Sequence, residues 1–158
     1  MVLSNSNGVA RMTKTTVIKR IGRNEIVLSV ENEIDSQSAL TADIQYSRML
    51  ADAIQRAASS GVDFRNADFS NLDLRRLNLT GLDLRGADLS GSVLDSTLLA
   101  FANLADANLC GIRMVSGSLA HANLRGANLI GACISHTDMT GALFWPIDDE
   151  RKCAGGKR

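Results

Sequence analysis

The side chains that most often perform catalysis are few in this sequence, and their spacing does not suit it. The chain has two histidines, His121 and His136, and three cysteines, Cys110, Cys133 and Cys153. Nucleophilic catalysis needs a base beside the nucleophile, and a zinc site needs three or four ligands together. The two histidines stand 15 positions apart and no cysteine pair has a redox or metal-binding spacing. We therefore predict no enzymatic activity, no cofactor and no metal site.

Charge and hydropathy narrow the class of protein further. The 17 basic and 17 acidic residues balance, whereas a non-specific nucleic-acid binder carries a broad positive field, so direct nucleic-acid binding is not expected. No apolar run approaches the roughly 20 residues that span a bilayer, and the N-terminus lacks a signal-peptide core. An odd number of cysteines without a pairing pattern favours reduced thiols. We predict a cytoplasmic protein.

An apolar residue occupies every fifth position from Phe64 to Phe144, in 17 consecutive units. A period of five fits neither a helix nor a strand, so the chain must turn once in each unit. The residue two places before each centre is small or aliphatic, and the residue two places after is often glycine, which suits a corner. Two residues of each unit therefore point inward. The predicted structural core includes Phe64, Phe69, Leu84, Leu89, Leu104, Leu109, Leu124 and Leu129.

The unit itself resembles a known family. Segments such as Ala87-Asp88-Leu89 and Ala107-Asn108-Leu109 match the Ala-(Asp/Asn)-Leu-X-X unit of pentapeptide-repeat proteins, and the resemblance covers residues 62–146. It implies a β-solenoid, a right-handed quadrilateral β-helix with four units to each coil. Seventeen units then give slightly more than four coils, a stack only about 20 Å long at the usual strand spacing.

The segment before the repeats is predicted to cap the solenoid. Residues 15–21 and 25–30 are β-branched runs around a glycine turn, which indicates a hairpin. Residues 40–59 have apolar side chains at helical spacing and end at Ser59-Ser60-Gly61, so we expect a helix whose apolar stripe covers the first coil near Phe64 and Phe69. This order of hairpin, helix and solenoid also resembles small pentapeptide-repeat proteins encoded by phages and prophages.

The expected domain organisation has four parts. A flexible N-terminus covers residues 1–14, and the hairpin with its capping helix covers residues 15–61. The β-helix covers residues 62–146, and Phe144, Trp145 and Pro146 are expected to cover its last coil. A polar, mobile tail follows at residues 147–158.

Stacking residues 20 positions apart produces a candidate charged face. Arg65, Arg85 and Arg125 fall in one column, and each follows an acid or amide by two residues. Two interpretations remain open. The arginines either form solvated ion pairs with these neighbours, or they form a stripe that binds an anionic partner.

A candidate interaction surface lies where the motif changes. Val93 and Leu98 stand where the repeat has Asp or Asn, and Phe101 and Val115 are further outward apolar residues. Outward apolar residues that cluster indicate a contact site. Three occupants remain open at this point: the N-terminal cap, a second copy in a homodimer, and a foreign protein.

These features favour a non-enzymatic binding module or scaffold that engages another protein through rigid solenoid faces. One form of this function is a phage-type inhibitor of a host defence or DNA-processing protein. A second hypothesis, implied by the family resemblance, is a DNA mimic that binds DNA gyrase or another topoisomerase. Against it, the repeats carry eight acidic and six basic residues, and a mimic needs a strongly acidic rod. A third hypothesis is a structural, self-assembling module.

Overall fold

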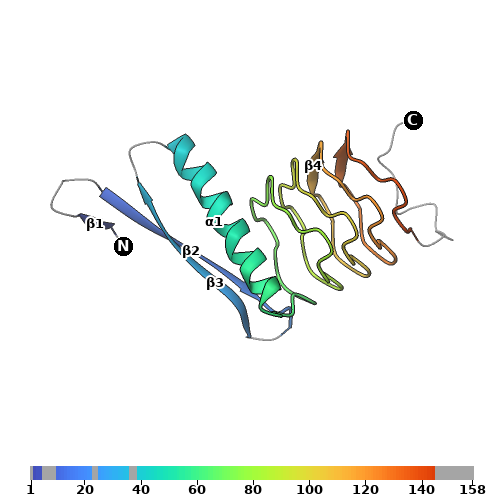
Figure 1. Ribbon diagram of the computed structural model, residues 1–158, viewed down its shortest axis with the longest axis horizontal. Helices are drawn as coiled ribbons and strands as arrows, with labels where there is room; N and C mark the ends of the chain where they lie inside the picture. Colours follow the sequence, from blue (N-terminus) through green and yellow to red (C-terminus); the bar gives the residue numbers. More distant parts are fainter. Residues whose placement is uncertain (1, 5–9, 23–24, 36–38, 145–158) are drawn as a thin grey trace.

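The computed structural model describes residues 2–4, 10–22, 25–35 and 39–144, and it describes the side chains of residues 15–22, 25–31 and 46–144. An antiparallel sheet and one helix precede a stack of coils (Figure 1). No helix within the described residues is long and apolar enough to cross a membrane. The elements are β1 (Val2–Ser4), β2 (Ala10–Lys19), β3 (Ile26–Asp35), α1 (Ala39–Ser59), β4 (Arg113–Val115) and β5 (Cys133–Ser135).

Parallel pairing joins residues 20 positions apart along the repeats. Asp68 pairs with Asp88, Asp88 with Asn108, and Asn108 with Asn128. The Phe69 amide donates to the Asp88 carbonyl oxygen at 2.7 Å, and the Asp88 amide donates to the Ala67 carbonyl oxygen at 3.0 Å. The predicted stacking of four units to a coil is thus confirmed. Most contacts between coils are single bridges, and only β4 and β5 form a longer parallel pair.

Every corner of the coils has the same backbone conformation. The residue two places after each centre, from Asn66 to Gly141, has φ between 53° and 73°. Glycine adopts this left-handed region freely, whereas other residues incur a cost of roughly 1 kcal/mol or more. Nine corners nonetheless carry a side chain. Some of these side chains lie over a glycine of the next coil. A β-carbon added to Gly86 would overlap the Asn66 side chain, and one added to Gly126 would overlap Asp106.

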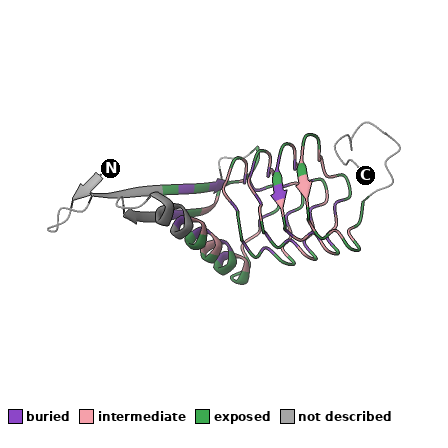
Figure 2. Ribbon diagram, turned by 90° about the horizontal axis from the view of Figure 1, so that it is seen from above, coloured by how far each residue is buried: buried purple, intermediate pink, exposed green. Residues whose placement is uncertain are grey.

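The interior of the coils contains the fifth-residue column (Figure 2). Seven of the eight core residues named from the sequence are buried: Phe64, Phe69, Leu84, Leu89, Leu104, Leu109 and Leu124. Leu129 is only partly buried, because no described coil lies beyond it. Two of the fully buried inward positions are polar and satisfied by the backbone. Ser92 Oγ donates to the Phe69 carbonyl oxygen and Thr97 Oγ1 to the Leu74 carbonyl oxygen, both at 2.6 Å.

The hairpin is joined to the first coil by main-chain pairing. Strands β2 and β3 are antiparallel, and the ladder continues into an antiparallel bridge between Arg20 and Ala67. The Asp68 amide donates to the Lys19 carbonyl oxygen at 2.7 Å. Buried side chains on one stripe of α1, including Leu50 and Ile54, belong to the same hydrophobic cluster as Phe64. One continuous core thus runs from the hairpin and helix into the coils.

The N-terminal expectation needs correction. The prediction of a flexible segment at residues 1–14 is wrong for the part that the structure describes, because β2 begins at Ala10 and pairs with β1. Polar residues extend the hairpin through backbone hydrogen bonds, which need no run of β-branched side chains. The predicted helix at residues 40–59 agrees with α1 to one residue. Trp145, Pro146 and the predicted tail at residues 147–158 lie outside the described residues.

Candidate interaction surface

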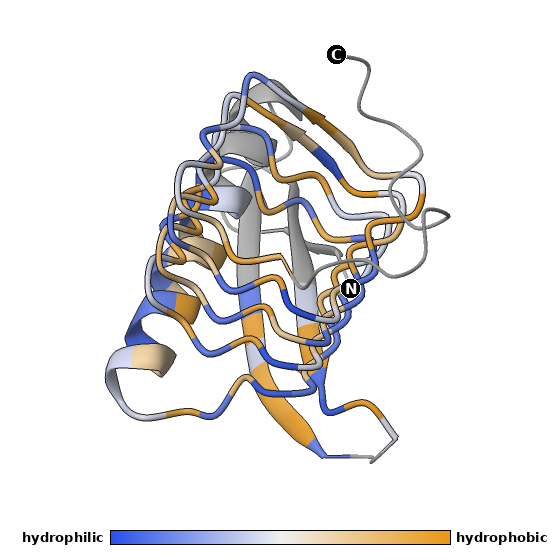
Figure 3. Ribbon diagram, turned by 90° about the vertical axis from the view of Figure 1, so that its right-hand side faces the viewer, coloured by the Kyte–Doolittle hydropathy of each residue, from blue (hydrophilic) through white to orange (hydrophobic). Residues whose placement is uncertain are grey.

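The solenoid has four sides, visible when it is viewed along the stack (Figure 3). One side follows the units centred on Leu79, Leu99, Leu119 and Met139, and we call it the Leu98 side. Asp138 is its only formally charged residue at neutral pH. Its outward residues form three columns of four: Asn78, Leu98, Ser118, Asp138; Thr80, Ala100, Ala120, Thr140; and Gly81, Phe101, His121, Gly141.

Two apolar side chains of the Leu98 side are strongly exposed. Leu98 is 44% exposed and Phe101 is 65% exposed, so no described residue of the hairpin or helix covers them. The Phe101 ring stacks on the His121 ring, with centroids 4.9 Å apart and planes 14° apart. Phe101 also has a φ of 59° at its corner, where a bulky side chain is a genuine outlier. The side therefore presents an aromatic pair next to the small side chains of Ala100 and Ala120.

The other two residues predicted for this surface lie around a corner. Val93 and Val115 belong to the adjoining side, and both are partly buried. Val93 pairs with Arg113, and the Val115 amide donates to Asp95 Oδ1 at 3.0 Å. Arg113 and Asp95 form an ion pair at 2.8 Å. The structure therefore brings together Leu98 and Phe101 but places Val93 and Val115 among charged groups.

Ala100, Ala120 and His121 also belong to this surface, although they are not among the residues predicted for it. Each is unremarkable by itself, and only the column that it shares with Leu98 or Phe101 gives it meaning. The 20-residue register would have placed all three on one side, so the signal was present in the repeat.

The candidate charged face contains self-contained ion pairs. Arg65 Nη2 lies 2.7 Å from Asp63 Oδ2, and Arg65 Nε lies 2.9 Å from Asp63 Oδ1. Arg85 pairs with Asp83 in the same two-pronged way, at 2.6 and 2.8 Å. These side-chain hydrogen bonds hold the pKa of both carboxyls below its ordinary value and raise the pKa of both guanidinium groups. Each positive charge is thus matched by its own acid.

Arg125 stands in the same column as Arg65 and Arg85 but is not adjacent to either of them. Ala105 separates it from Arg85, and the acid two residues earlier is replaced by Asn123. The Arg125 amide donates to Asn123 Oδ1 at 3.3 Å. The geometry therefore favours the solvated ion pairs over a continuous arginine stripe.

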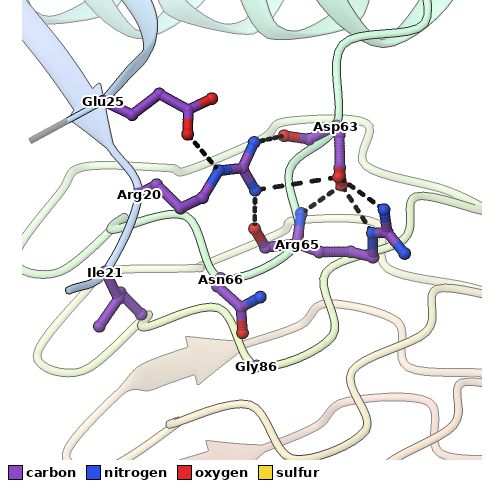
Figure 4. Close-up of a pocket in the computed structure, with 7 residues that line it drawn as sticks. All are labelled: Arg20, Ile21, Glu25, Asp63, Arg65, Asn66 and Gly86. Carbon is purple, nitrogen blue, oxygen red and sulfur yellow. Dashed lines mark hydrogen bonds and ion pairs between the residues drawn. The ribbon is translucent and has the colours of Figure 1, made fainter. Parts of the chain in front are cut away.

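A pocket lies where the hairpin meets the first coil, lined by residues that include Arg20, Glu25, Asp63 and Arg65 (Figure 4). Arg20 donates to the Arg65 carbonyl oxygen, to the Asp63 carbonyl oxygen at 3.2 Å and to Glu25 Oε2 at 3.2 Å. The guanidinium group thus binds acceptors of the chain itself and joins the end of the hairpin to the first coil.

Chemically reactive groups are not gathered anywhere in the described part of the chain. Within it, no group of three or more His, Cys, Asp or Glu residues is placed to hold a metal ion. Cys110 and Cys133 form no disulfide. What the described surface offers is contact area, and of the four solenoid sides the Leu98 side carries the fewest charged residues.

Comparison with known proteins identifies the same five-residue repeat. The family described as "Pentapeptide repeats" matches residues 60–95, 78–115 and 102–145, in eight copies. Similar solved structures are Rfr23 from Cyanothece 51142 (28% identity, TM-score 0.33) and alr5209 from Nostoc PCC 7120 (30%, TM-score 0.33). A third is HetL from Nostoc sp. PCC 7120, involved in heterocyst differentiation regulation (33%, TM-score 0.26).

The matched segments cover part of each chain. They represent 50%, 53% and 48% of this chain, and 60%, 81% and 40% of Rfr23, alr5209 and HetL respectively. The comparison with curated proteins found no match.

Proposed function

The chain belongs to the pentapeptide repeat family, and from this premise we propose that it is a non-enzymatic interaction module whose Leu98 side binds another protein. The family fold is a right-handed quadrilateral β-helix, and its members commonly mediate protein–protein interactions. A stiff solenoid loses little conformational entropy on binding. The Leu98 side is also poor in charge, as the cores of interfaces are.

The observation that carries the proposal is Phe101. A ring that is 65% exposed contributes little to the core. It also occupies a left-handed corner where glycine or asparagine is less costly. Among the nine described corners that carry a side chain, Phe101 is the only apolar residue, so its presence at an exposed corner suggests a purpose other than folding. Phe101 and the adjacent Leu98 are therefore the proposed anchors of the binding surface.

In this proposal the hairpin and α1 form an N-terminal cap on a solenoid of about four coils. An uncapped end would expose unpaired backbone groups and the apolar interior. The bridge between Arg20 and Ala67, the contacts of the Arg20 guanidinium group and the shared hydrophobic cluster support this role. The cap leaves the Leu98 side uncovered, so binding to this side needs no opening of the molecule.

Affinity capture from a lysate of the source organism tests the proposal. The bait is the full chain, compared with the variant Leu98→Asp/Phe101→Asp. The matched control is Ile130→Asp, which adds a charge at a 52% exposed apolar residue on another side. We expect specific proteins to be retained by the wild type and the control and lost from the double variant. Retention of the same proteins by all three baits would contradict the proposed surface.

A further inference from the structure

The outward columns of the Leu98 side have a symmetry of their own. From the first coil to the last, the middle column is Thr80, Ala100, Ala120 and Thr140. The corner column has glycine at both ends and the stacked rings of Phe101 and His121 between them. Each column has the same order of residue types in both directions. The middle column has threonine at its ends and alanine at its centre, and the corner column has glycine at its ends and rings at its centre. When a second copy is turned end to end, each residue of these two columns therefore lies opposite a residue of its own type.

We propose that the Leu98 side binds the same side of a second copy of this chain, with the two solenoids antiparallel. This inference rests on the proposed function of the side as a contact surface and names one occupant. The two-fold axis lies in the interface, parallel to the bridging strands. It keeps each column opposite the same column and reverses the order of the coils, as an isologous interface requires.

The arrangement defines which residues meet. Ala100 lies opposite the partner's Ala120, so the flat centres of the two sides approach closely. Phe101 lies opposite the partner's His121, which extends the intramolecular ring pair across the interface, and aromatic pairs of this kind are favourable. Leu98 lies opposite the partner's Ser118.

The column of Asn78, Leu98, Ser118 and Asp138, which we call the edge column, adds a polar contact. Asn78 lies opposite the partner's Asp138 in the antiparallel arrangement. Asn78 Oδ1 accepts the Thr80 amide at 3.1 Å, and Asp138 Oδ1 accepts the Thr140 amide at 3.0 Å. The Asn78 side-chain nitrogen is then the donor that meets the partner's carboxylate, and hydrogen bonds to a charged group are the stronger kind.

The antiparallel arrangement is favoured over a parallel one by charge. A parallel pair has its two-fold axis along the stack, which keeps the order of the coils and reverses the order of the columns. Asp138 would then lie opposite the partner's Gly141, which has no side-chain donor. Reversal of one copy keeps the edge columns opposite each other and places Asp138 opposite the partner's Asn78.

The size of the surface determines how strong the association is. Four strands at a spacing of about 4.8 Å make a side less than about 20 Å high. A side of this height offers less contact area than the roughly 800 Å² per partner of a standard interface. We therefore expect a weak, concentration-dependent dimer, and a foreign protein that uses the same side competes with it.

Sedimentation velocity of the full chain tests the association, from micromolar to near-millimolar concentration. We expect the weight-average mass to rise above that of a monomer with increasing concentration. Leu98→Asp/Phe101→Asp should weaken self-association at least tenfold, and Ile130→Asp should leave it unchanged. A monomer at every concentration, or equal association by all three proteins, would overturn the inference.

Cross-linking tests the orientation, in a background with Cys110, Cys133 and Cys153 replaced by serine. Thr80→Cys and Thr140→Cys are prepared as separate proteins and treated with a short thiol cross-linker, because in the antiparallel pair each lies opposite the other but three coils away from its own counterpart. The antiparallel pair predicts that the mixture cross-links and that neither protein cross-links alone. Cross-linking of each protein with itself in preference to the mixture indicates a parallel pair and overturns the proposal.

The two proposals fail separately. A protein that stays monomeric, but whose captured partners are lost in Leu98→Asp/Phe101→Asp, refutes the second copy and leaves the proposed function intact. Antiparallel self-association without any partner that depends on this side refutes binding of a foreign protein and supports the second copy.

Discussion

At the scale of single residues, Phe101 occupies a corner where the fold does not require its side chain. Its corner has a φ of 59°, and the corners one coil before and two coils after it in the same column are glycines, Gly81 and Gly141. Asn66 and Asn71 occupy other corners with nearly the same φ, which shows that a short polar side chain is accepted. The fold therefore gives no reason for a phenylalanine at this position.

Phe101→Asn should consequently keep or raise stability while it removes binding. Asparagine tolerates the left-handed region better than phenylalanine, and the exposed ring contributes little burial. We expect the free energy of unfolding in urea to be unchanged or up to about 1 kcal/mol higher, with partner capture and self-association both reduced. A loss of more than about 1 kcal/mol would show that the ring stabilises the fold and would weaken the functional argument.

Asp73 should give the protein a stability contribution that depends on pH. Side-chain hydrogen bonds from Arg75 hold the Asp73 pKa below its ordinary value, and Ser47 of α1 contributes in the same direction. A lowered folded-state pKa contributes stability that is fully present above the unfolded pKa of about 4 and is lost as pH falls through the folded value. Arg75 is half exposed, so we expect at most about 1 kcal/mol.

Urea unfolding of wild type and Asp73→Asn between neutral and acid pH measures this contribution. Asparagine keeps an oxygen for the Arg75 amide, which donates to Asp73 Oδ1 at 3.2 Å, and it removes the charge together with Oδ2, which accepts from Arg75 Nη2 at 2.6 Å. The wild type should be the more stable protein at pH 7, and the difference should disappear well below pH 4. An equal difference at both pH values would indicate that charge is not the cause.

At the scale of elements, a coil buries its centre where another coil, or the hairpin and helix at the N-terminal end, lies on each side. Leu104 is completely buried between its neighbours, whereas Leu129 in the last described coil is partly exposed. The same substitution should therefore have different costs in the two coils. Leu104→Ala should lower the free energy of unfolding by about 3 kcal/mol, within the range for buried leucines.

Leu129→Ala should cost less than half as much, because it removes a side chain that already contacts solvent. Chemical denaturation of both variants provides the comparison, and each variant serves as the control for the other. Equal costs would mean that the C-terminal coil is as well covered as the middle of the stack, in contradiction to the partial exposure of Leu129.

The period of the repeat accounts for how much of this architecture could be predicted. An apolar residue at every fifth position sets the inward column, so Leu84 and Leu104 could be placed from sequence alone. The length of the hairpin was underestimated, because backbone pairing such as that of Met12 with Ile34 does not require a recognisable pattern of side chains. The four residues of the candidate surface do not all lie on one side. Leu98 and Phe101 share one side, whereas Val93 and Val115 lie on the adjoining side. The charged groups around the two valines come from neighbouring coils, so a deviation from the motif within one unit does not predict them.

At the scale of the whole molecule, the distribution of charge argues against DNA mimicry. A mimic needs acidic columns that act together as the phosphates of a duplex do. Here Asp63, Asp73 and Asp83 each pair with the arginine two residues later, at N–O distances of 2.6 to 2.7 Å. Asp95 is likewise paired with Arg113. These four acids therefore project little net negative field, and the two sides of the solenoid that carry them are close to neutral.

We accordingly expect no inhibition of DNA gyrase supercoiling by this protein, even in large molar excess. The sensitive control is a variant with Arg65, Arg75 and Arg85 replaced by glutamine, which frees the three carboxylates while the apolar core stays unchanged. If unpaired acid columns are what a topoisomerase recognises, this variant should inhibit more than the wild type. Inhibition by the wild type near equimolar concentration would show that neutralised columns suffice for mimicry. The function would then belong to the charged sides of the solenoid and not to the Leu98 side.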